Sequence, residues 1–253
     1  MSDIEYAFAR MSARLGARPD EAAWHRLETV RGYAGALDVA RATPHAEWVD
    51  GIAHDSDAHA IDAALRARWR DAVAEVATWM PDAWQPAVGW TAVLADVPVL
   101  EHLARGGEAL RWIASDPAYR DLAIGAAESC PAALTEGPLA PFASAWRDPD
   151  RLFDVWHKTW EARLPRLDAS GRAGRAMLAR LLRAHAVAIG APALRDAWPL
   201  RRALQLRLLQ LFRRILAEPI AAFVYLAIVA LDLERLRGEL VRRAAFPAGT
   251  ALA

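Results

Sequence analysis

The sequence has little cysteine, almost no lysine and no net charge. Cys130 is the single cysteine among 253 residues, so no disulfide bond can form within the chain, which fits a reducing compartment such as the cytoplasm. The 31 acidic and 31 basic residues balance. A protein that binds nucleic acid needs a net basic surface to neutralise phosphates. The composition therefore argues against nucleic acid as a partner.

The sequence also lacks an apolar run long enough to cross a bilayer. Its longest such run, Ile220–Leu231, spans about a dozen residues, whereas a membrane helix needs roughly 20. Residues 1–16 contain early acidic residues and no apolar run, so we expect no signal peptide. Any association with a membrane is expected to come through a partner or a surface, from a cytoplasmic location.

The alternating pattern of β-strands and the βαβ order of parallel sheets are both missing. Nearly every segment shows helical periodicity instead. The clearest example begins at Ser56 or Asp57 and ends before Pro81, and its apolar residues recur at three- and four-residue steps: Ile61, Leu65, Trp69, Val73, Val76 and Met80. The sequence predicts an all-α fold built from multi-helix lobes. No repeat of 20–50 residues is visible, so we do not expect a solenoid.

One stretch is rich in residues that break helices. Residues 129–141 contain Pro131, Gly137, Pro138 and Pro141. Proline and glycine punctuate loops and boundaries. We therefore predict an N-terminal part with one or more helical lobes at 1–128, a linker at 129–147 and a C-terminal helical lobe at 148–253.

The last long helix is predicted at Glu218–Arg243 and has two different halves. The residues from Ile220 to Leu231 are apolar on every side, and a helix of this kind must be covered on every side. The residues from Asp232 to Arg243 alternate acidic, basic and leucine side chains. We expect the first half to lie inside the helical core and the second half to project from it with one charged face.

The densest polar cluster contains two histidines and three acidic residues: His54, Asp55, Asp57, His59 and Asp62. Such residues could bind a metal ion, which would make a metal-dependent helical hydrolase one alternative. Acidic residues just before a helix also serve as N-caps and interact favourably with its positive end. We expect capping, and no second motif in the sequence completes a metal site.

Other candidate residues have simple structural interpretations. Cys130 could be a catalytic nucleophile, or it could be a buried or incidental thiol without a catalytic role. We expect the second. His185 lies among apolar positions, including Leu181 and Leu182, that are predicted to face inward. The segment 171–175, GRAGR, lacks the strand and the lysine of a phosphate-binding loop. No set of residues brings together a nucleophile, a base and an oxyanion site, so we expect neither catalysis nor a cofactor.

The segment Pro199–Arg214 carries arginines around a leucine-rich stripe: Arg201, Arg202, Arg207, Arg213 and Arg214. This pattern has two interpretations. The arginines can form an ordinary solvated helix face, because their stems also cover apolar surface. They could instead dock an acidic partner or anionic lipid head groups.

Both ends of the chain resemble the C subunit of A/V-type ATP synthases, which is called d in the eukaryotic vacuolar proton pump. The run from Tyr6 to Leu15, YAFARMSARL, resembles the opening helix of that family. The segment Ala42-Thr43-Pro44 is similar to its early turn, and a long helix follows at 60–79. The segment from Glu218 to Leu240, which includes Tyr225-Leu226 and LERLRGEL, resembles its closing helix.

The sequence differs from the family pattern at three points. Arg235 stands where the family usually has asparagine, and His45 lies near the place of the expected tyrosine of the turn. The chain is also shorter than typical members, which have three pseudo-repeated lobes. The reduced lobe is expected around residues 129–141.

The resemblance implies a funnel-like, all-helical subunit without catalytic residues. Such a subunit lies on the cytoplasmic face of the membrane rotor ring, receives the base of the central stalk and transmits torque for ion transport. The partners implied are the central-stalk subunits and the rotor ring, from a peripheral position on the inner face of the membrane. The residues carried over as partner-binding candidates, with lobe packing as the alternative role, are Tyr6, Arg10, Tyr225, Glu234 and Arg237.

Overall fold

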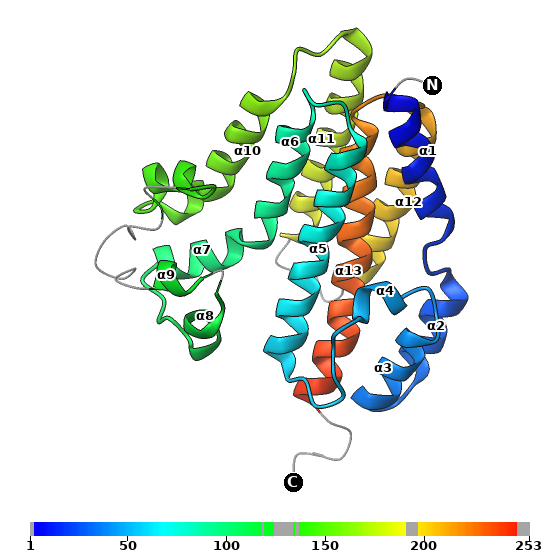
Figure 1. Ribbon diagram of the computed structural model, residues 1–253, viewed down its shortest axis with the longest axis vertical. Coiled ribbons are helices and arrows are strands. Elements are labelled where there is room, and N and C mark those ends of the chain that lie inside the picture. Colours follow the sequence, from blue (N-terminus) through cyan, green and yellow to red (C-terminus); the bar gives the residue numbers. More distant parts are fainter. Residues whose placement is uncertain (1–2, 118, 124–133, 135–136, 191–196, 247–253) are drawn as a thin grey trace. The chain divides into compact units, whose positions relative to one another are not determined.

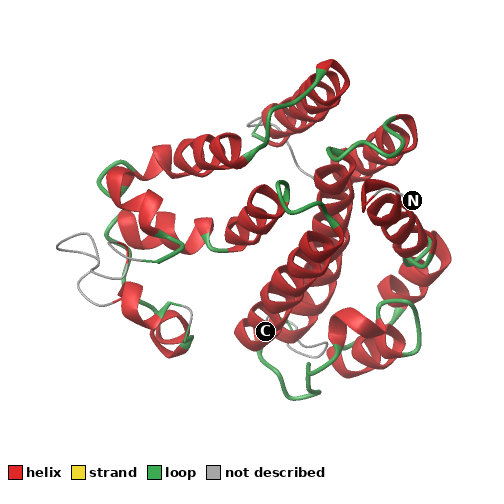
Figure 2. Cartoon of the chain, turned by 45° about the horizontal axis from the view of Figure 1, so that its top comes forward, coloured by secondary structure: helices red, strands yellow, loops and turns green. Residues whose placement is uncertain are grey.

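A computed structural model describes residues 3–117, 119–123, 134, 137–190 and 197–246. Helices joined by loops make up these residues, and none of them belongs to a β-strand (Figure 2). The predicted all-α fold is confirmed.

The chain forms two compact units. The first unit combines residues 1–85 with 166–253 and contains α1 (Asp3–Gly16), α2 (Glu21–Thr29), α3 (Tyr33–Arg41), α4 (Ala46–Val49), α5 (Ala58–Trp79), α11 (Ala169–Ile189), α12 (Trp198–Arg214) and α13 (Ala221–Ala245). The second unit spans residues 86–165 and contains α7 (Val97–Ala104), α8 (Arg111–Ser115), α9 (Arg120–Ala123) and α10 (Leu152–Arg163), with 3-10 turns at Thr91–Ala95, Ala140–Ala145 and Pro149–Arg151. Helix α6 (Gln85–Trp90) begins at the boundary.

This grouping differs from the lobes expected at 1–128 and 148–253. The C-terminal helices join the N-terminal ones because α13 packs along α5 and also contacts α1 and α3 (Figure 1). The expected linker at 129–147 includes 129–133 and 135–136, which lie outside the described residues.

Helix α13 is the centre of the first unit. In its apolar half, Ile220 and every residue of the run 221–226 are buried. This half packs between α5 and α12, and a run that is apolar on every side has no other stable place. The prediction for the first half of the closing helix is confirmed.

The second half of α13 does not project from the core, so that expectation was wrong. Leu236 and Leu240 are fully buried, and Asp232, Arg235 and Arg243 are buried as well. Charged groups can be buried when oppositely charged or hydrogen-bonding groups meet them, and residues of the α1–α2 region and of α12 supply those groups here.

Helix α5 confirms the stripe read from the sequence. Its apolar residues Ile61, Leu65, Trp69, Val73 and Val76 are all buried. Its first turn is capped by Asp57, whose carboxylate accepts a hydrogen bond of 2.8 Å from the amide of Ala60. The capping role expected for the acidic cluster is confirmed at this residue.

Tryptophan side chains contribute hydrogen bonds and ring contacts to the packing of the second unit. Trp90 donates its indole N–H to the carbonyl of Trp156 at 3.0 Å, and Trp156 donates its own to the carbonyl of Trp90 at 3.3 Å. Phe142 stacks on Trp90, and the guanidinium of Arg163 lies 4.2 Å from the centre of the Trp90 ring system. Trp90 and Trp156 therefore act as packing residues with satisfied N–H groups.

Within the described ranges, no single helix has the length and apolarity to cross a bilayer. The segments Gln85–Ala95 and Val97–Ala104 reach that length and composition only when taken together, and a bend of 54° separates them.

Candidate functional site

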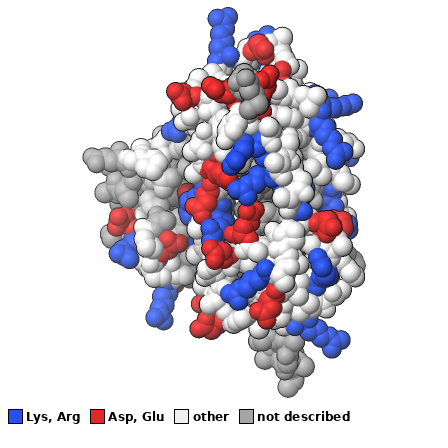
Figure 3. Space-filling view, turned by 45° about the vertical axis from the view of Figure 1, so that its right-hand side comes forward, with Lys and Arg blue, Asp and Glu red and all other residues white. Residues whose placement is uncertain are grey.

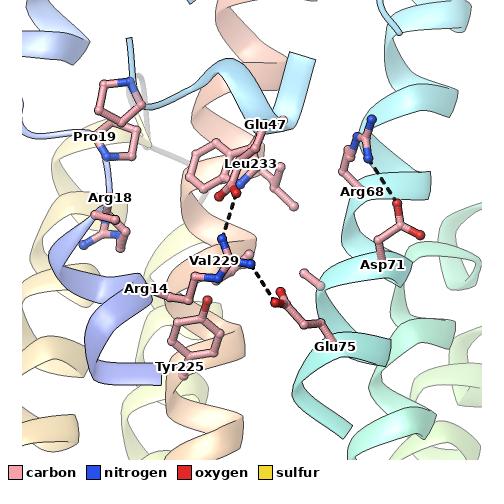
Figure 4. A pocket seen from close by; sticks show the side chains of 14 residues that line it. Arg14, Arg18, Pro19, Glu47, Arg68, Asp71, Glu75, Tyr225, Val229 and Leu233 are labelled. Atoms are coloured by element: carbon pink, nitrogen blue, oxygen red, sulfur yellow. Dashed lines mark hydrogen bonds and ion pairs between the residues drawn. The ribbon is translucent and has the colours of Figure 1, made fainter. Parts of the chain in front are cut away.

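A pocket of about 270 Å³ opens within the first unit, among α1, α4, α5 and α13. Figure 4 shows side chains from these elements around it. The lining mixes both charges with aromatic and aliphatic groups: Arg14, Ala17, Arg18, Pro19, Pro44, Glu47, Trp48, Arg68, Asp71, Ala72, Glu75, Tyr225, Val229 and Leu233. The pocket therefore joins the opening helix of the chain to its closing helix.

Arg14 links three sides of this pocket. Its guanidinium donates to Glu75 of α5 at 2.6 Å and to Glu47 of α4 at 3.0 Å, as the dashed lines in Figure 4 mark. The hydrogen bond from Arg14 to Glu75 raises the pKa of the Arg14 guanidinium further. Acidic and basic side chains are also intermixed on the face seen in Figure 3. The pocket presents paired charges of both signs.

Tyr225 supplies the pocket with a hydroxyl group that has no hydrogen-bond partner among the described residues. Only 7% of this residue is exposed, and its side chain lines the cavity. Figure 4 shows the ring beside Arg14 with the hydroxyl directed toward that side chain. Burial raises the pKa of the Tyr225 hydroxyl to about 12. The group is therefore neutral at physiological pH and can donate or accept a hydrogen bond within the pocket.

A buried ion pair lies next to the pocket. Asp232 is fully buried, and its carboxylate accepts two hydrogen bonds from Arg18, with the Nη2 of Arg18 at 2.7 Å. The side-chain amide of Gln205 donates to the same carboxylate at 2.6 Å. A buried charge pair of this kind is stable only because further hydrogen bonds complete it. This network joins α12 and α13 to the loop after α1.

The structure brings two of the predicted partner-binding residues to the pocket or its edge. Tyr225 lines the pocket. Arg10 lies beside it, with its guanidinium 5.1 Å from the centre of the Trp79 ring system and 4.0 Å from Glu75. Tyr6 lies one turn earlier on α1 and is 43% exposed.

The other two predicted residues, Glu234 and Arg237, do not line the pocket. Glu234 pairs with Arg201 of α12 at 3.4 Å, and it lies 3.9 Å from Arg237. Arg237 pairs with Asp62 of α5. Both residues therefore make ion pairs between helices within the chain.

Sequence reasoning missed two arginines of α13 that are more deeply buried. Arg235 lies 4.3 Å from the centre of the Trp24 ring system and pairs with Glu28 at 2.6 Å. It occupies the position where the resembled family usually has asparagine. It follows Ile228 by seven residues and Leu231 by four, and this helical spacing is the only sequence signal that could have placed it inside.

Arg243 closes the end of α2. Its guanidinium donates to the carbonyls of Leu27 at 3.2 Å, Glu28 at 3.0 Å and Val30 at 3.2 Å. The last carbonyls of a helix have no partner within that helix, so an arginine from a distant segment satisfies them. The end of the chain thus stabilises a helix near its beginning.

His45, near the turn that carries part of the resemblance, is fully buried. Its Nδ1 lies 2.8 Å from the hydroxyl of Thr43, and its ring meets Trp24 edge-on with centroids 4.3 Å apart. Burial, followed by the charges of Arg235 and Arg26, lowers the pKa of His45 to about 4. The histidine is therefore neutral at physiological pH.

The polar cluster proposed as a metal site is divided among other partners. The Nε2 of His54 lies 2.7 Å from Asp38, and Asp62 pairs with Arg66 and Arg237. Among the residues that the structure describes, no three His, Cys, Asp or Glu side chains are grouped so that they could hold a metal ion. The geometry of these residues does not support the hydrolase alternative.

The remaining candidates have mixed outcomes. In the GRAGR segment, the amide of Gly171 donates to the capping carboxylate of Asp168, and Gly174 is buried against Ile215 and Ile220. His185 is partly buried, and desolvation lowers its pKa. Leu182 was expected to face inward and is 40% exposed, because α11 packs mainly against α12. Cys130 lies outside the described residues.

Comparisons with family models, with curated proteins and with solved structures find no match to this chain. Its function is therefore inferred from its residues and their geometry.

Proposed function

We propose that this chain is a non-catalytic subunit of an A/V-type rotary ATPase, which couples the central stalk to the membrane rotor ring during ion transport. Its place would be the cytoplasmic side of the membrane, bound peripherally. The first unit would receive a segment of the stalk, and the pocket between α1 and α13 would be the point of contact.

The position of Tyr225 is the observation that carries this proposal. The opening and closing stretches both carry the resemblance to the rotary subunit, and more than 200 residues separate them in the sequence. In the fold, α1 packs against α13, and the pocket lies where they meet. Tyr225 belongs to the closing stretch and directs an unpaired hydroxyl into that pocket.

The chemistry of the pocket supports binding. The carboxylates of Glu47 and Glu75 are held by Arg14, and Asp71 lies 3.4 Å from Arg68. Paired charges of both signs give a surface that can orient polar and charged side chains of a partner, which favours specificity. The volume of about 270 Å³ is near the lower end of the range for small-molecule sites and suits a few side chains of a protein segment.

The direct test measures binding of the purified chain to the central-stalk subunit of the same rotary ATPase. Tyr225→Phe removes the free hydroxyl and keeps the ring. We expect it to weaken stalk binding about fivefold, because one hydrogen bond contributes about 1 kcal/mol. Tyr33→Phe is the matched control, since the hydroxyl of Tyr33 donates to the carbonyl of Ala53 away from the pocket. Absence of stalk binding by the unaltered chain would reject the proposal.

Arg237 needs a different experiment because it already has a partner within the chain. Arg237→Glu should weaken stalk binding whether the residue contacts the stalk or only positions α13 against α5. The exchanged pair Asp62→Arg with Arg237→Glu restores an ion pair between the two helices. Recovery of stalk binding in the exchanged pair would assign Arg237 to packing within the first unit. Because Asp62 also pairs with Arg66, continued loss would assign Arg237 to the stalk contact only if the exchanged pair unfolds at the same urea concentration as the unaltered chain.

The alternative is a helical scaffold of another system that shares only its helix pattern with the rotary subunit. Purification of the tagged chain together with its bound proteins separates the two functions. A scaffold would bind other proteins at the pocket, and Tyr225→Phe would weaken that binding while the stalk subunit remained unbound.

A further inference from the structure

Helices α11 and α12 carry an unusual concentration of one charge. Together they contain nine arginines and no acidic residue, although the whole chain has no net charge: Arg172, Arg175, Arg180, Arg183, Arg201, Arg202, Arg207, Arg213 and Arg214. The two helices pack against each other in the first unit. The acidic residues that balance these charges therefore lie elsewhere in the chain.

Some of these arginines have partners within the first unit. Arg201 pairs with Glu234, Arg202 pairs with Glu21, and Arg172 donates to the carbonyl of Leu167. Five others make no ion pair with any residue that the structure describes: Arg180, Arg183, Arg207, Arg213 and Arg214. All five are exposed. Their charges are available to a partner outside the chain.

Exposed aliphatic side chains lie among these arginines. Val187 is one turn beyond Arg183 on α11 and is 73% exposed. Leu206 precedes Arg207 on α12 and is 62% exposed, and Arg213 lies two turns beyond Leu206 on the same side of the helix. Leu216, two residues after the end of α12, is exposed as well. The exposed sides of the two helices therefore combine free guanidinium groups with aliphatic groups that gain from leaving water.

We propose that this surface, here called the basic face, binds the anionic head groups of a membrane surface. It is formed by Arg180, Arg183, Val187, Leu206, Arg207, Arg213, Arg214 and Leu216. Guanidinium groups bind phosphate through paired hydrogen bonds, and anionic lipids attract exposed basic residues near the surface. The aliphatic groups would enter the region between head groups and acyl chains, as they do in helices that lie on membranes.

The mixture of side chains favours a lipid surface over an acidic protein. Binding to an acidic protein would use the arginines and would leave Val187 and Leu206 without a favourable environment unless the partner also offered apolar groups. A membrane surface offers phosphates and an apolar layer a few ångströms apart, and both kinds of side chain on the basic face are then satisfied.

This inference goes beyond the proposed coupling function and does not depend on it. A rotary subunit could be held at the membrane by the rotor ring alone, and a scaffold of another system could also bind lipids. The test therefore uses the purified chain with vesicles and contains no stalk or ring subunit, so that its failure leaves the stalk-binding result untouched.

The experiment measures co-sedimentation of the chain with two kinds of vesicle. One is phosphatidylcholine alone, and the other is phosphatidylcholine mixed with anionic phosphatidylglycerol. The chain should bind the anionic vesicles and not the neutral ones. Binding should weaken as salt is added, because exposed charges are screened over about 10 Å at 0.1 M ionic strength. Equal binding to both vesicles, or binding to neither, would overturn the proposal.

Two pairs of substitutions locate the contact. Arg183→Glu with Arg207→Glu reverses two charges on the basic face and should lower the partition onto anionic vesicles at least about tenfold. Arg120→Glu with Arg147→Glu makes the same change in net charge at exposed positions of the second unit and should leave the partition within about twofold. Equal losses in both pairs would show a general charge effect and would overturn the assignment to the basic face.

A third variant tests the aliphatic groups. Val187→Ser with Leu206→Ser keeps every charge and removes apolar groups that are exposed in the free protein, so folding should be unaffected. We expect binding to anionic vesicles to fall at least about fivefold, because about 1 kcal/mol or more of apolar burial is lost. Unchanged binding would contradict the insertion of these side chains into the membrane surface.

Discussion

The arginines of α13 and those of α11 and α12 occupy helices of the same unit and have opposite surroundings. On α13, Arg235 and Arg243 are buried and meet carboxylates or carbonyls of residues near the start of the chain. On α11 and α12, Arg183 and Arg207 are exposed and meet no carboxylate among the described residues. The same side chain thus stabilises the fold in one place and leaves a charged surface in the other.

The difference comes from what lies opposite each helix. Helix α13 packs among α5, α12, α1 and α3. Its buried charged groups therefore need oppositely charged or hydrogen-bonding partners, because an unpaired buried charge is costly. Helix α11 packs mainly against α12 and needs few matched charges. We therefore expect substitutions in the two regions to differ in kind: loss of stability around α13 and loss of binding on the basic face.

The largest effect is expected at the ion pair beside the pocket. Asp232→Ala leaves the charge of Arg18 without its carboxylate in a buried place, and we expect it to lower the free energy of unfolding by about 3–5 kcal/mol. Urea unfolding at neutral pH measures this. Arg202→Ala breaks the exposed pair with Glu21 and should change the same quantity by no more than about 1 kcal/mol. Similar values for both variants would contradict the burial of the pair.

The next largest effect compares two adjacent arginines at the end of α13. Arg243→Ala removes the donors to three carbonyls at the end of α2 and should lower the free energy of unfolding by about 2–3 kcal/mol. Arg242 is exposed, and its neighbouring carboxylate is on the same helix. Arg242→Ala should therefore have an effect below about 0.5 kcal/mol. Unfolding of the two variants at the same urea concentration would contradict the capping role of Arg243.

The pH dependence of stability gives a smaller effect. His45 has a folded pKa of about 4, below the unfolded value of about 6.5. Its neutral form therefore stabilises the fold above about pH 6.5, and that contribution is lost as the pH falls toward 4. Between about pH 7.5 and about pH 5 we expect a loss of about 2 kcal/mol from this residue.

The measurement for His45 is urea unfolding at the two pH values. His45→Phe should remove this part of the pH dependence, whereas His25→Gln at an exposed position should keep it. A pH dependence that is unchanged in His45→Phe would show that other groups cause it.

The smallest effect is expected on the basic face. Arg183→Ala removes an exposed side chain without an ion pair, so the free energy of unfolding should stay within about 0.5 kcal/mol of the unaltered value. Thermal and urea unfolding check this prediction. A loss of unfolding free energy as large as that of Arg243→Ala would show that the arginines of the basic face also stabilise the fold. It would contradict the difference between the two regions.

Much of the fold could be predicted from apolar periodicity. The stripe from Ile61 to Val76 and the run from Ile220 to Leu226 are buried as expected, because only a buried place suits such surfaces. The buried ends of Arg235 and Arg243 could not be predicted. A charged residue on a helix is solvated in most cases, and its burial depends on carboxylates and carbonyls more than 200 positions away.

The candidate site could be predicted only in part. Tyr225 was identified through the resemblance, and the structure places it in the pocket. Its neighbours Arg14, Glu47 and Glu75 come from three helices, and no local pattern in the sequence brings them together. Glu234 and Arg237 were identified on the same helix and face other partners. Residues nine and twelve positions after Tyr225 are rotated by about 180° and about 120° around the helix axis and so leave its side of the helix.

The most direct test of the coupling function is purification of the tagged chain from membranes of its own source. We expect central-stalk and rotor-ring subunits of a rotary ATPase to co-purify with the chain. We also expect Tyr225→Phe to reduce the recovered stalk subunit and Tyr33→Phe to leave it unchanged. Membranes that contain the assembled ATPase but yield none of its subunits with the tagged chain would contradict the proposed function.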